Sequence, residues 1–543
     1  MKKILILLLT IGFVFMSSCN EDTFLKEEPK DNIFAENLFL NYDGFVNGLN
    51  AMYALVREDR EGQSNTTRAS LWQMGTDNVF VNGGAAAFDP FNDYNDLNSE
   101  NALVSANFNW LYRIVNSANL IINRAENTPV DWMGTNDAAD LVNQNKVIAQ
   151  ARLFRAWAYR HLRYGWGAVP LSLQEIEGST YRSDWERNSI AEINAQMVID
   201  LKFATENLEM REDVGLVNAA VAGTMLAEVY LDMGENEKAE IEALKVINSP
   251  EYQLMTTRFG VDASEPGTAF TDLFINPMPK NDNREVLWVL NNAYSDVVGN
   301  SYLNMKSIWN SYYSKDSKLK KYDLNTLYTY NGGKGTGRLS VTDSAFGWYG
   351  STDDRYSEYA VKKYYIFPTD DSATSFNIIG TTKMVYSKPD DLEDNFLWPW
   401  VRKWEYNDPL FENASKNGQY DDQMFMRLAE TYLLAAEALM KNNKPDLAAS
   451  YLTTLRARSN ASAVTASEVT MDFILEERSR ELVTEEYRKH TLVRTGTFYE
   501  RTVQYNPRLD ETKVFEYNEY FPIPQDIIDA NTGAVMPQND GYN

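Results

Sequence analysis

Apolar residues recur at intervals of three and four over much of this chain, and this pattern most constrains its fold. The pattern is clearest in four long segments, 102–126, 144–164, 189–208 and 217–233. Residues at this spacing lie on one face of an α-helix, so each segment is expected to bury one side against a neighbour. The sequence therefore predicts a mainly α-helical protein in which long helices pack together.

Two segments far apart in the chain resemble each other and predict a repeated helix hairpin. AGTMLAEVYLDMGENEKAEIEALKVI begins at Ala222, and RLAETYLLAAEALMKNNKPDLAASYLTTLRA begins at Arg427. Each contains A-E-x-Y in an amphipathic helix, then a polar turn and a second helix rich in alanine. Pro445 suits the first turn of its helix. The pattern resembles tetratricopeptide hairpins, which need neighbours to bury their apolar faces.

Two stretches, 76–101 and 251–425, interrupt the helical pattern. Glycine, proline, asparagine and aspartate are frequent in both, and only EVLWVLNN (285–292) and AVKKYYIFP (360–368) are typical of short strands. Long irregular segments in a compact domain usually carry function. We expect one domain over residues 36–543, with a helical scaffold and two long insertions. The scaffold is predicted to comprise 36–75, 102–250 and 426–543.

The start of the chain has the pattern of a secretory signal. Two lysines precede an apolar run at residues 4–15, and Ser17 and Ser18 are the small residues of a cleavage site. An apolar run of about a dozen residues is too short to cross a bilayer, and no other stretch approaches the length required. Residues 1–18 are therefore predicted to be a signal peptide.

Cys19, the only cysteine of the chain, directly follows these small residues. This spacing resembles the processing site of a bacterial lipoprotein, where the cysteine is acylated, although Met16 stands where leucine is commonest. The alternative is an ordinary secreted protein with one free thiol, which is unusual in an oxidising compartment. We expect Cys19 to be lipidated and the polar residues 19–35 to form a flexible tether. The protein would then be held at a membrane by its lipid anchor only.

The composition argues against several classes of function. The net charge of −26 repels phosphate backbones and anionic lipids, so no nucleic-acid partner is expected. Two histidines and one cysteine leave few groups for a zinc site or a Cys–His nucleophile. Aromatic residues make up 13% of the chain. Such amphipathic rings can stack on sugar rings where they are exposed.

Six segments, in order along the chain, resemble the motifs of one protein family. They are AQARLFRAWAYRHLRYGWGAVPL (149–171), RLAETYLLAAEAL (427–439), LTTLRARS (452–459), ILEERSRELVTEEYRKHTLVRTG (474–496), FPIPQDIIDAN (521–531) and the terminal NDGYN. Together they resemble the SusD/RagB family, and the resemblance covers essentially the whole mature chain. Glu21 and Asp22 also fit, because surface export in these bacteria favours acidic residues after the lipidated cysteine.

The resemblance implies a SusD-like fold and a binding protein rather than an enzyme. Members of the family are outer-membrane lipoproteins of Bacteroidetes that bind nutrients at the cell exterior. The expected partner is a SusC-like TonB-dependent transporter, over which the protein acts as a lid. The expected ligand is an oligosaccharide, and no cofactor or metal is expected. Because some relatives are thought to serve peptide uptake, a peptide-binding protein of the same fold remains an alternative.

The resemblance places the ligand residues in the two irregular stretches. Sugar C–H faces pack on aromatic rings, while sugar hydroxyls need hydrogen-bond donors and acceptors. The candidates in the first stretch are Phe80, Asn82, Phe91 and Tyr94, and those in the second are Tyr302, Trp309, Tyr312, Tyr313, Tyr330 and Arg338. Each could instead be a packed scaffold residue. Trp348, Trp398 and Trp400 are expected to pack.

The charged residues of the motif helices are expected to join helices rather than to catalyse. These residues are Arg152, Arg155, Arg480 and Arg488, with Glu477, Glu481 and Glu485. A glycan-degrading enzyme would need two opposed carboxylates in a cleft, and no recognisable glycosidase pattern is present. There is no G-x-S-x-G, and GGKGTG does not match a phosphate-binding loop. The run from Asp89 to Asp96 could ligate calcium, but it lacks EF-hand spacing and is more typical of a solvated acidic loop.

Overall fold

The computed structural model describes most of the chain from residue 38 to residue 542. The described residues are 38–62, 66–82, 86–178, 180–213, 215–278, 282–292, 302–315, 319, 322–368, 381–385, 398–406 and 418–542. The predicted signal peptide, Cys19 and the predicted tether lie outside these residues. Among the described helices, none has both the length and the apolar character needed to cross a membrane.

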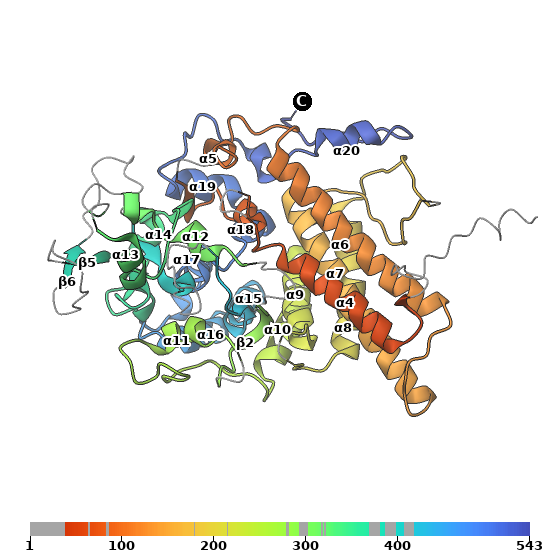
Figure 1. Ribbon diagram of the computed structural model, residues 1–543, viewed down its shortest axis with the longest axis horizontal. Coiled ribbons are helices and arrows are strands. Elements are labelled where there is room, and N and C mark those ends of the chain that lie inside the picture. Colours follow the sequence, from red (N-terminus) through yellow and green to blue (C-terminus); the bar gives the residue numbers. More distant parts are fainter. Residues whose placement is uncertain are drawn as a thin grey trace, which may run out of the picture.

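Long helices form the first part of the scaffold, as the apolar spacing predicts. They are α4 (Tyr42–Arg57), α6 (Ala102–Asn127), α7 (Asp137–Trp166), α8 (Ile190–Asn207), α9 (Ala219–Asp232) and α10 (Asn236–Ile247). From α6 to α10 each helix packs on the next, and α4 lies against α6 and α7 (Figure 1). Asn136 caps the start of α7, because its side chain accepts hydrogen bonds from two backbone amides at 3.1 Å.

The two similar segments form neighbouring helix hairpins. The second hairpin consists of α15 (Leu428–Lys441) and α16 (Pro445–Ala457), and α15 packs on α10 of the first. The equivalent glutamates of the two A-E-x-Y patterns converge on one arginine, because Arg160 lies 2.7 Å from Glu228 and 3.9 Å from Glu430. This arrangement confirms the predicted mainly helical fold of packed hairpins.

Shorter helices complete the C-terminal part of the scaffold. They are η8 (Ala466–Glu468), α17 (Met471–Leu482), α18 (Arg488–Arg494), α19 (Phe498–Tyr505), η9 (Glu516–Glu519) and α20 (Gln525–Ala530). The segment before α20 packs across the end of α7, where Trp166 donates to the carbonyl of Pro522 at 3.0 Å. This contact holds the C-terminal segment on the scaffold.

The two insertions contain more regular structure than their composition predicts. The first contains β1 (Val79–Val81) and α5 (Pro90–Asp93), and η1 (Arg68–Trp72) precedes it in the scaffold. The helices of the second are α11 (Ala269–Ile275), α12 (Met305–Trp309), η3 (Tyr313–Lys315), α13 (Leu324–Tyr330), α14 (Asp343–Gly347), η4 (Asp354–Tyr356) and η7 (Arg402–Trp404). Its strands are β2 (Val286–Leu290), β3 (Leu339–Val341), β4 (Val361–Lys362), β5 (Tyr364–Pro368), β6 (Thr381–Val385), β7 (Trp400–Val401) and β8 (Gln423–Arg427).

The described strands form antiparallel pairs, β1–β3, β2–β8, β4–β7 and β5–β6. The pair β1–β3 joins the two insertions, with Val79 opposite Val341. The pair β2–β8 closes the second insertion where it leaves and re-enters the scaffold. The segment 285–292 forms one strand as predicted, whereas 360–368 divides into two short strands that pair with different partners.

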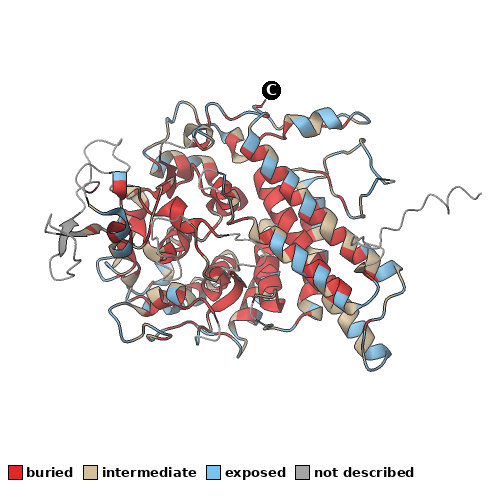
Figure 2. Ribbon diagram, in the orientation of Figure 1, coloured by how far each residue is buried: buried red, intermediate tan, exposed pale blue. Residues whose placement is uncertain are grey.

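One large apolar core runs through the scaffold and reaches into both insertions. In α7 every residue from Val147 to Trp166 except Arg152 is buried, and Figure 2 shows this helix buried between its neighbours. A helix buried on all sides must pair its charges internally. Arg155 accordingly lies 2.7 Å from Asp200, and Arg163 lies 3.0 Å from Asp232.

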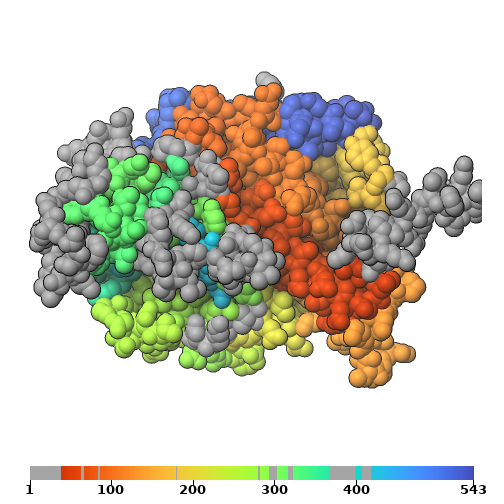
Figure 3. All heavy atoms as spheres, in the orientation of Figure 1, coloured from red at the N-terminus to blue at the C-terminus, as the bar shows by residue number. Residues whose placement is uncertain are grey.

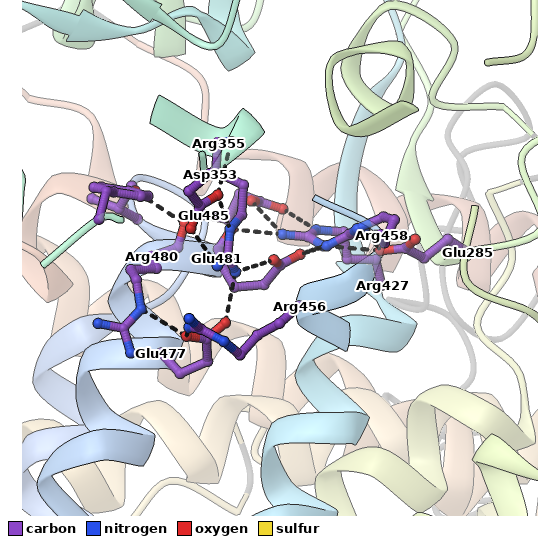
Figure 4. Close-up of polar contacts among 12 residues, drawn as sticks. Glu285, Asp353, Arg355, Arg427, Arg456, Arg458, Glu477, Arg480, Glu481 and Glu485 are labelled. Carbon is purple, nitrogen blue, oxygen red and sulfur yellow. Dashed lines mark hydrogen bonds and ion pairs between the residues drawn. The ribbon is translucent and has the colours of Figure 1, made fainter. Parts of the chain in front are cut away.

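A buried cluster of charges joins the second insertion to the C-terminal helices (Figure 4). We call it the charge cluster; its members are Glu285, Asp353, Arg355, Lys403, Arg427, Arg456, Arg458, Glu477, Arg480, Glu481 and Glu485. Arg355 from η4 reaches Glu477 at 2.7 Å and Glu481 at 2.9 Å, both on α17. The predicted joining role is thereby confirmed for Glu477, Glu481 and Glu485.

Candidate ligand-binding site

Three of the predicted ligand residues of the first insertion are buried rings. Phe80 meets Trp398 edge to face, with ring centroids 5.2 Å apart, and Phe91 meets Phe521 in the same way at 5.9 Å. The Tyr94 hydroxyl donates to a backbone carbonyl at 3.0 Å. Since each side chain is at most 2% exposed, it offers no ring face to a ligand. Phe91 and Tyr94 thus pack the first insertion on the scaffold, and Phe80 packs it on the second insertion.

Three further candidates, Asn82, Trp309 and Tyr313, are also at most 2% exposed. Asn82 hydrogen-bonds Ser340 across the β1–β3 pair. Tyr313 stacks on Trp400 with centroids 5.7 Å apart and an interplanar angle of 13°. At these three positions and at the three rings above, the structure shows the packed alternative that the sequence left open. Long-range packing covers all six.

Four predicted residues, Tyr302, Tyr312, Tyr330 and Arg338, are only partly buried and remain candidates. Burial lowers the pKa of Arg338 from its ordinary value, and the neighbouring Tyr312 opposes that shift. A β-carbon at position 418 would lie 2.6 Å from the Tyr302 ring, so the glycine there allows the chain to pass close to that ring.

The structure adds aromatic and cationic neighbours that the sequence did not single out. The rings of Tyr302 and Tyr420 meet edge to face at 6.2 Å. Lys306 lies 5.6 Å above the ring of Tyr406, and Lys315 lies 5.5 Å above the ring of Tyr312. The only sequence signal for these residues was the high frequency of tyrosine in the second insertion.

A hollow of about 500 Å³ lies where the first insertion meets the scaffold. We call it the junction hollow; it is lined by Glu58, Glu61, Gly62, Thr66, Arg68, Ala87, Ala102, Leu103 and Ala106. Its wall adjoins Tyr302 directly, because Glu61 pairs with Leu303 in a β-bridge and Asn304 donates to the carbonyl of Gly62 at 2.9 Å. Figure 3 shows green atoms of the second insertion on the same face as α4 and α6.

The junction hollow, with Tyr302 next to the segment that bonds its wall, forms the candidate ligand-binding site, and Tyr312, Tyr330 and Arg338 are the other half-buried candidates of the second insertion. It combines tyrosine rings with carboxylate, hydroxyl and guanidinium groups. Such a surface can hold a sugar, because rings pack on C–H faces while polar groups bond hydroxyls. Within the described residues, no group of three or more histidine, cysteine or acidic side chains is placed to hold a metal ion.

The two histidines and Asp59 are buried in the core. Burial lowers the pKa values of His161 and His490 well below their ordinary value, and their rings meet inside the core at 4.6 Å. Burial raises the pKa of Asp59 to about 6, although the hydrogen bond from Tyr487 acts to lower that pKa. That carboxyl is fully buried and accepts the tyrosine hydroxyl at 2.7 Å. In the acidic run of the first insertion, Asp93 pairs with Lys513 at 3.1 Å.

Comparison with known proteins decides the family. The model of the SusD family, SusD_RagB, matches residues 259–542, more than half of the chain. The chain belongs to the SusD family. SusD-like protein P25 of Formosa agariphila is 22% identical over 98% of this chain and 97% of its own length.

Solved structures of the SusD superfamily share the fold of this SusD-family chain. A laminarin-binding SusD-like protein superimposes with a TM-score of 0.67 at 20% identity, covering 93% of this chain and all of its own. Surface glycan-binding protein A of Bacteroides thetaiotaomicron, solved with laminarihexaose, also has a TM-score of 0.67 at 20% identity and covers 92% of this chain and 99% of its own.

Proposed function

We propose that this SusD-family protein is a cell-surface glycan-binding lipoprotein that captures oligosaccharide without cleaving it. The observation that carries the proposal is the junction hollow, with half-buried tyrosines and hydrogen-bonding groups beside it. Its volume of about 500 Å³ lies within the range of small-molecule sites. The similarity to a laminarin-binding SusD-like protein and to a surface glycan-binding protein solved with laminarihexaose supports a glycan as the ligand class.

The proposal includes delivery to a membrane transporter. Cys19, placed after a secretory signal, supports a lipid anchor in the outer membrane that faces the cell exterior. Family membership supports a SusC-like TonB-dependent transporter as the partner, with this chain as its lid. Metabolic labelling with an alkyne fatty acid tests the anchor: Cys19→Ala should abolish labelling. Copurification of the wild-type protein with an outer-membrane β-barrel tests the partner.

Calorimetry against laminari-, cello-, malto- and xylo-hexaose, with tryptic peptides as a further ligand class, tests the binding function. Tyr312→Ala and Tyr302→Ala should each weaken binding about tenfold, because each removes a ring face. Tyr451→Ala on scaffold helix α16 is the matched control and should bind like the parent. Binding of peptides instead of every glycan would replace the proposal with peptide uptake. Release of shorter sugars during the incubation would contradict a non-catalytic role.

A further inference from the structure

A second and larger hollow, of about 600 Å³, lies on the scaffold rather than on the insertions. We call it the α6 hollow, because the residues of α6 from Phe108 to Ser117 form its floor. Its remaining walls are the loop 170–185 and the segment 527–536 around α20. Figure 3 shows these three segments, coloured orange, yellow and blue, meeting at the upper right of the molecule.

Hydrogen bonds fix the walls of the α6 hollow without any ligand. The Tyr112 hydroxyl donates to the carbonyl of Pro170 at 2.6 Å. The Asn531 side chain accepts from the backbone amide of Trp185 at 2.7 Å and donates to its carbonyl at 2.8 Å. These bonds hold three separate segments in place before a ligand binds. The hollow is therefore preorganised, and binding does not have to order its walls.

The lining of the α6 hollow combines rings with polar groups and contains no carboxylate. Trp185 and Tyr112 are half-buried, and Tyr181 is 67% exposed. Asn109 and Arg113 are exposed at the rim, and the contact of this arginine with Glu58 is a weak surface pair at 3.4 Å. In a chain of net charge −26, a carboxylate-free lining favours a neutral or acidic ligand with ring faces and hydroxyls.

The α6 hollow and the junction hollow are neighbours that share two helices. Leu55 on α4 lines the α6 hollow, and Glu58, three residues later at the C-terminal cap of this helix, lines the junction hollow. On α6, Ala106 lines the junction hollow and Asn109, three residues later, lines the α6 hollow. Three residues of helix span about 4.5 Å, and the ion pairs of Glu58 with Arg68 and Arg113 lie between the two hollows.

We propose that the α6 hollow is a carbohydrate subsite that extends the junction site, so that one glycan chain occupies both. The proposal rests on the proposed function and adds a dependence on chain length. A short oligosaccharide fills the junction site alone. A longer one continues past Glu58 and packs a further sugar ring against Trp185 and Tyr112, with its hydroxyls toward Asn109 and Arg113. The second contact is intramolecular and therefore raises the affinity for long chains selectively.

Calorimetry of Trp185→Ala with trisaccharides and hexasaccharides of the four glucan and xylan series tests this extension. The affinity for the hexasaccharide should fall about tenfold and that for the trisaccharide less than twofold, because only the longer chain reaches the lost ring. Trp185→Phe should restore most of the hexasaccharide affinity. The bonds to Asn531 involve the backbone of residue 185, so they survive either substitution.

Tyr181→Ala provides a second variant with little risk to folding, because this side chain is mostly exposed. It should reproduce the length-selective loss, while Tyr451→Ala should leave both affinities unchanged. Equal affinities of Trp185→Ala, Tyr181→Ala and the parent for hexasaccharide would overturn the extension and leave the proposed function standing. Equal loss at both lengths would also overturn it, since the α6 hollow would then be the primary site. If the parent binds no oligosaccharide, the proposed function itself fails.

Discussion

The scaffold and the second insertion are held together by different interactions. In the scaffold, helices adjacent in sequence pack on one another through apolar faces, from α6 to α10 and from α15 to α16. In the second insertion, the described strands form two-stranded pairs, and the small apolar clusters there do not form one core. The charge cluster joins this insertion to α17. The scaffold is therefore stabilised mainly by contacts close in sequence, and the insertion by contacts far apart in sequence.

This difference has a consequence for stability. Burying apolar surface contributes at any pH, whereas a buried charge cluster depends on every member keeping its charge. Burial would raise the pKa of Glu477, but Arg355, Arg480 and Arg456 outweigh it and hold that pKa at about 2. The same arrangement keeps the pKa of Glu481 well below its ordinary value, with Arg458 and Arg427 opposing the effect of burial. The attachment of the second insertion at Arg355 should therefore weaken as these glutamates take up protons in acid.

Acidification should produce the largest effect and distinguishes the two regions directly. The folded pKa of Glu477, about 2, lies below its ordinary value of 4.5, so the unfolded chain takes up protons first. The stability that this group contributes is present above pH 4.5 and is lost as the pH falls toward 2. Hydrogen exchange across this range should show segment 353–362 losing protection before α9 and α10. If segment 353–362 and helices α9 and α10 lost protection at the same pH, the proposed difference between the two regions would be wrong.

Glu481→Gln tests the charge cluster at neutral pH. The substitution leaves Arg355, Arg427 and Arg458 short of a counter-charge in a buried site, which should cost about 3–5 kcal/mol in the free energy of unfolding. Urea denaturation measures the loss. Glu476→Gln on the same helix is the matched control and should change stability by less than about 0.5 kcal/mol, because its pair is partly exposed. If Glu481→Gln were as stable as Glu476→Gln, the charge cluster would not anchor the insertion.

Tyr313→Phe should have a smaller and more local effect. The Tyr313 hydroxyl is buried and donates to the carbonyl of Gly333 at 2.8 Å. Removing it leaves that carbonyl without its donor, at a cost of about 1–2 kcal/mol. Limited proteolysis should detect faster cleavage within 322–341 and unchanged cleavage in α6–α8. Tyr330→Phe on α13 is the control. Equal rates of cleavage within 322–341 in the two variants would contradict the prediction.

The helices of the scaffold could be predicted because their signal is local. The segments 102–126 and 189–208 correspond to α6 and α8 within one residue at each end. Helix α7 begins at Asp137, well before the predicted 144, because its first two turns are largely exposed, Leu141 and Val142 included, and carry no apolar period. The repeated A-E-x-Y pattern correctly predicted two helix hairpins. The glutamates of both patterns lie near the same side chain, Arg160.

The candidate site could be predicted only as a region. Composition pointed to the irregular stretches, which stays a prediction, but it could not show which rings are covered. Phe80 is covered by Trp398 and Tyr313 by Trp400, and these partners are distant in sequence. The α6 hollow was missed for the same reason: Tyr112, Trp185 and Asn531 meet only in the folded chain. Residue type indicates suitable chemistry, while exposure depends on long-range contacts.

Ser189→Ala, at the start of α8, is expected to have the smallest effect and tests whether scaffold stability is as local as the comparison implies. The Ser189 hydroxyl accepts from the backbone amide of Glu192 at 3.3 Å, and that glutamate accepts in return from the serine amide at 2.8 Å. Loss of one such cap should cost about 1 kcal/mol and loosen only the first turn of α8 in hydrogen exchange. Ser462→Ala, an exposed serine in the loop after α16, should cost nothing measurable. If the cap variant also loosened the second insertion, the two regions would be coupled more tightly than their contacts indicate.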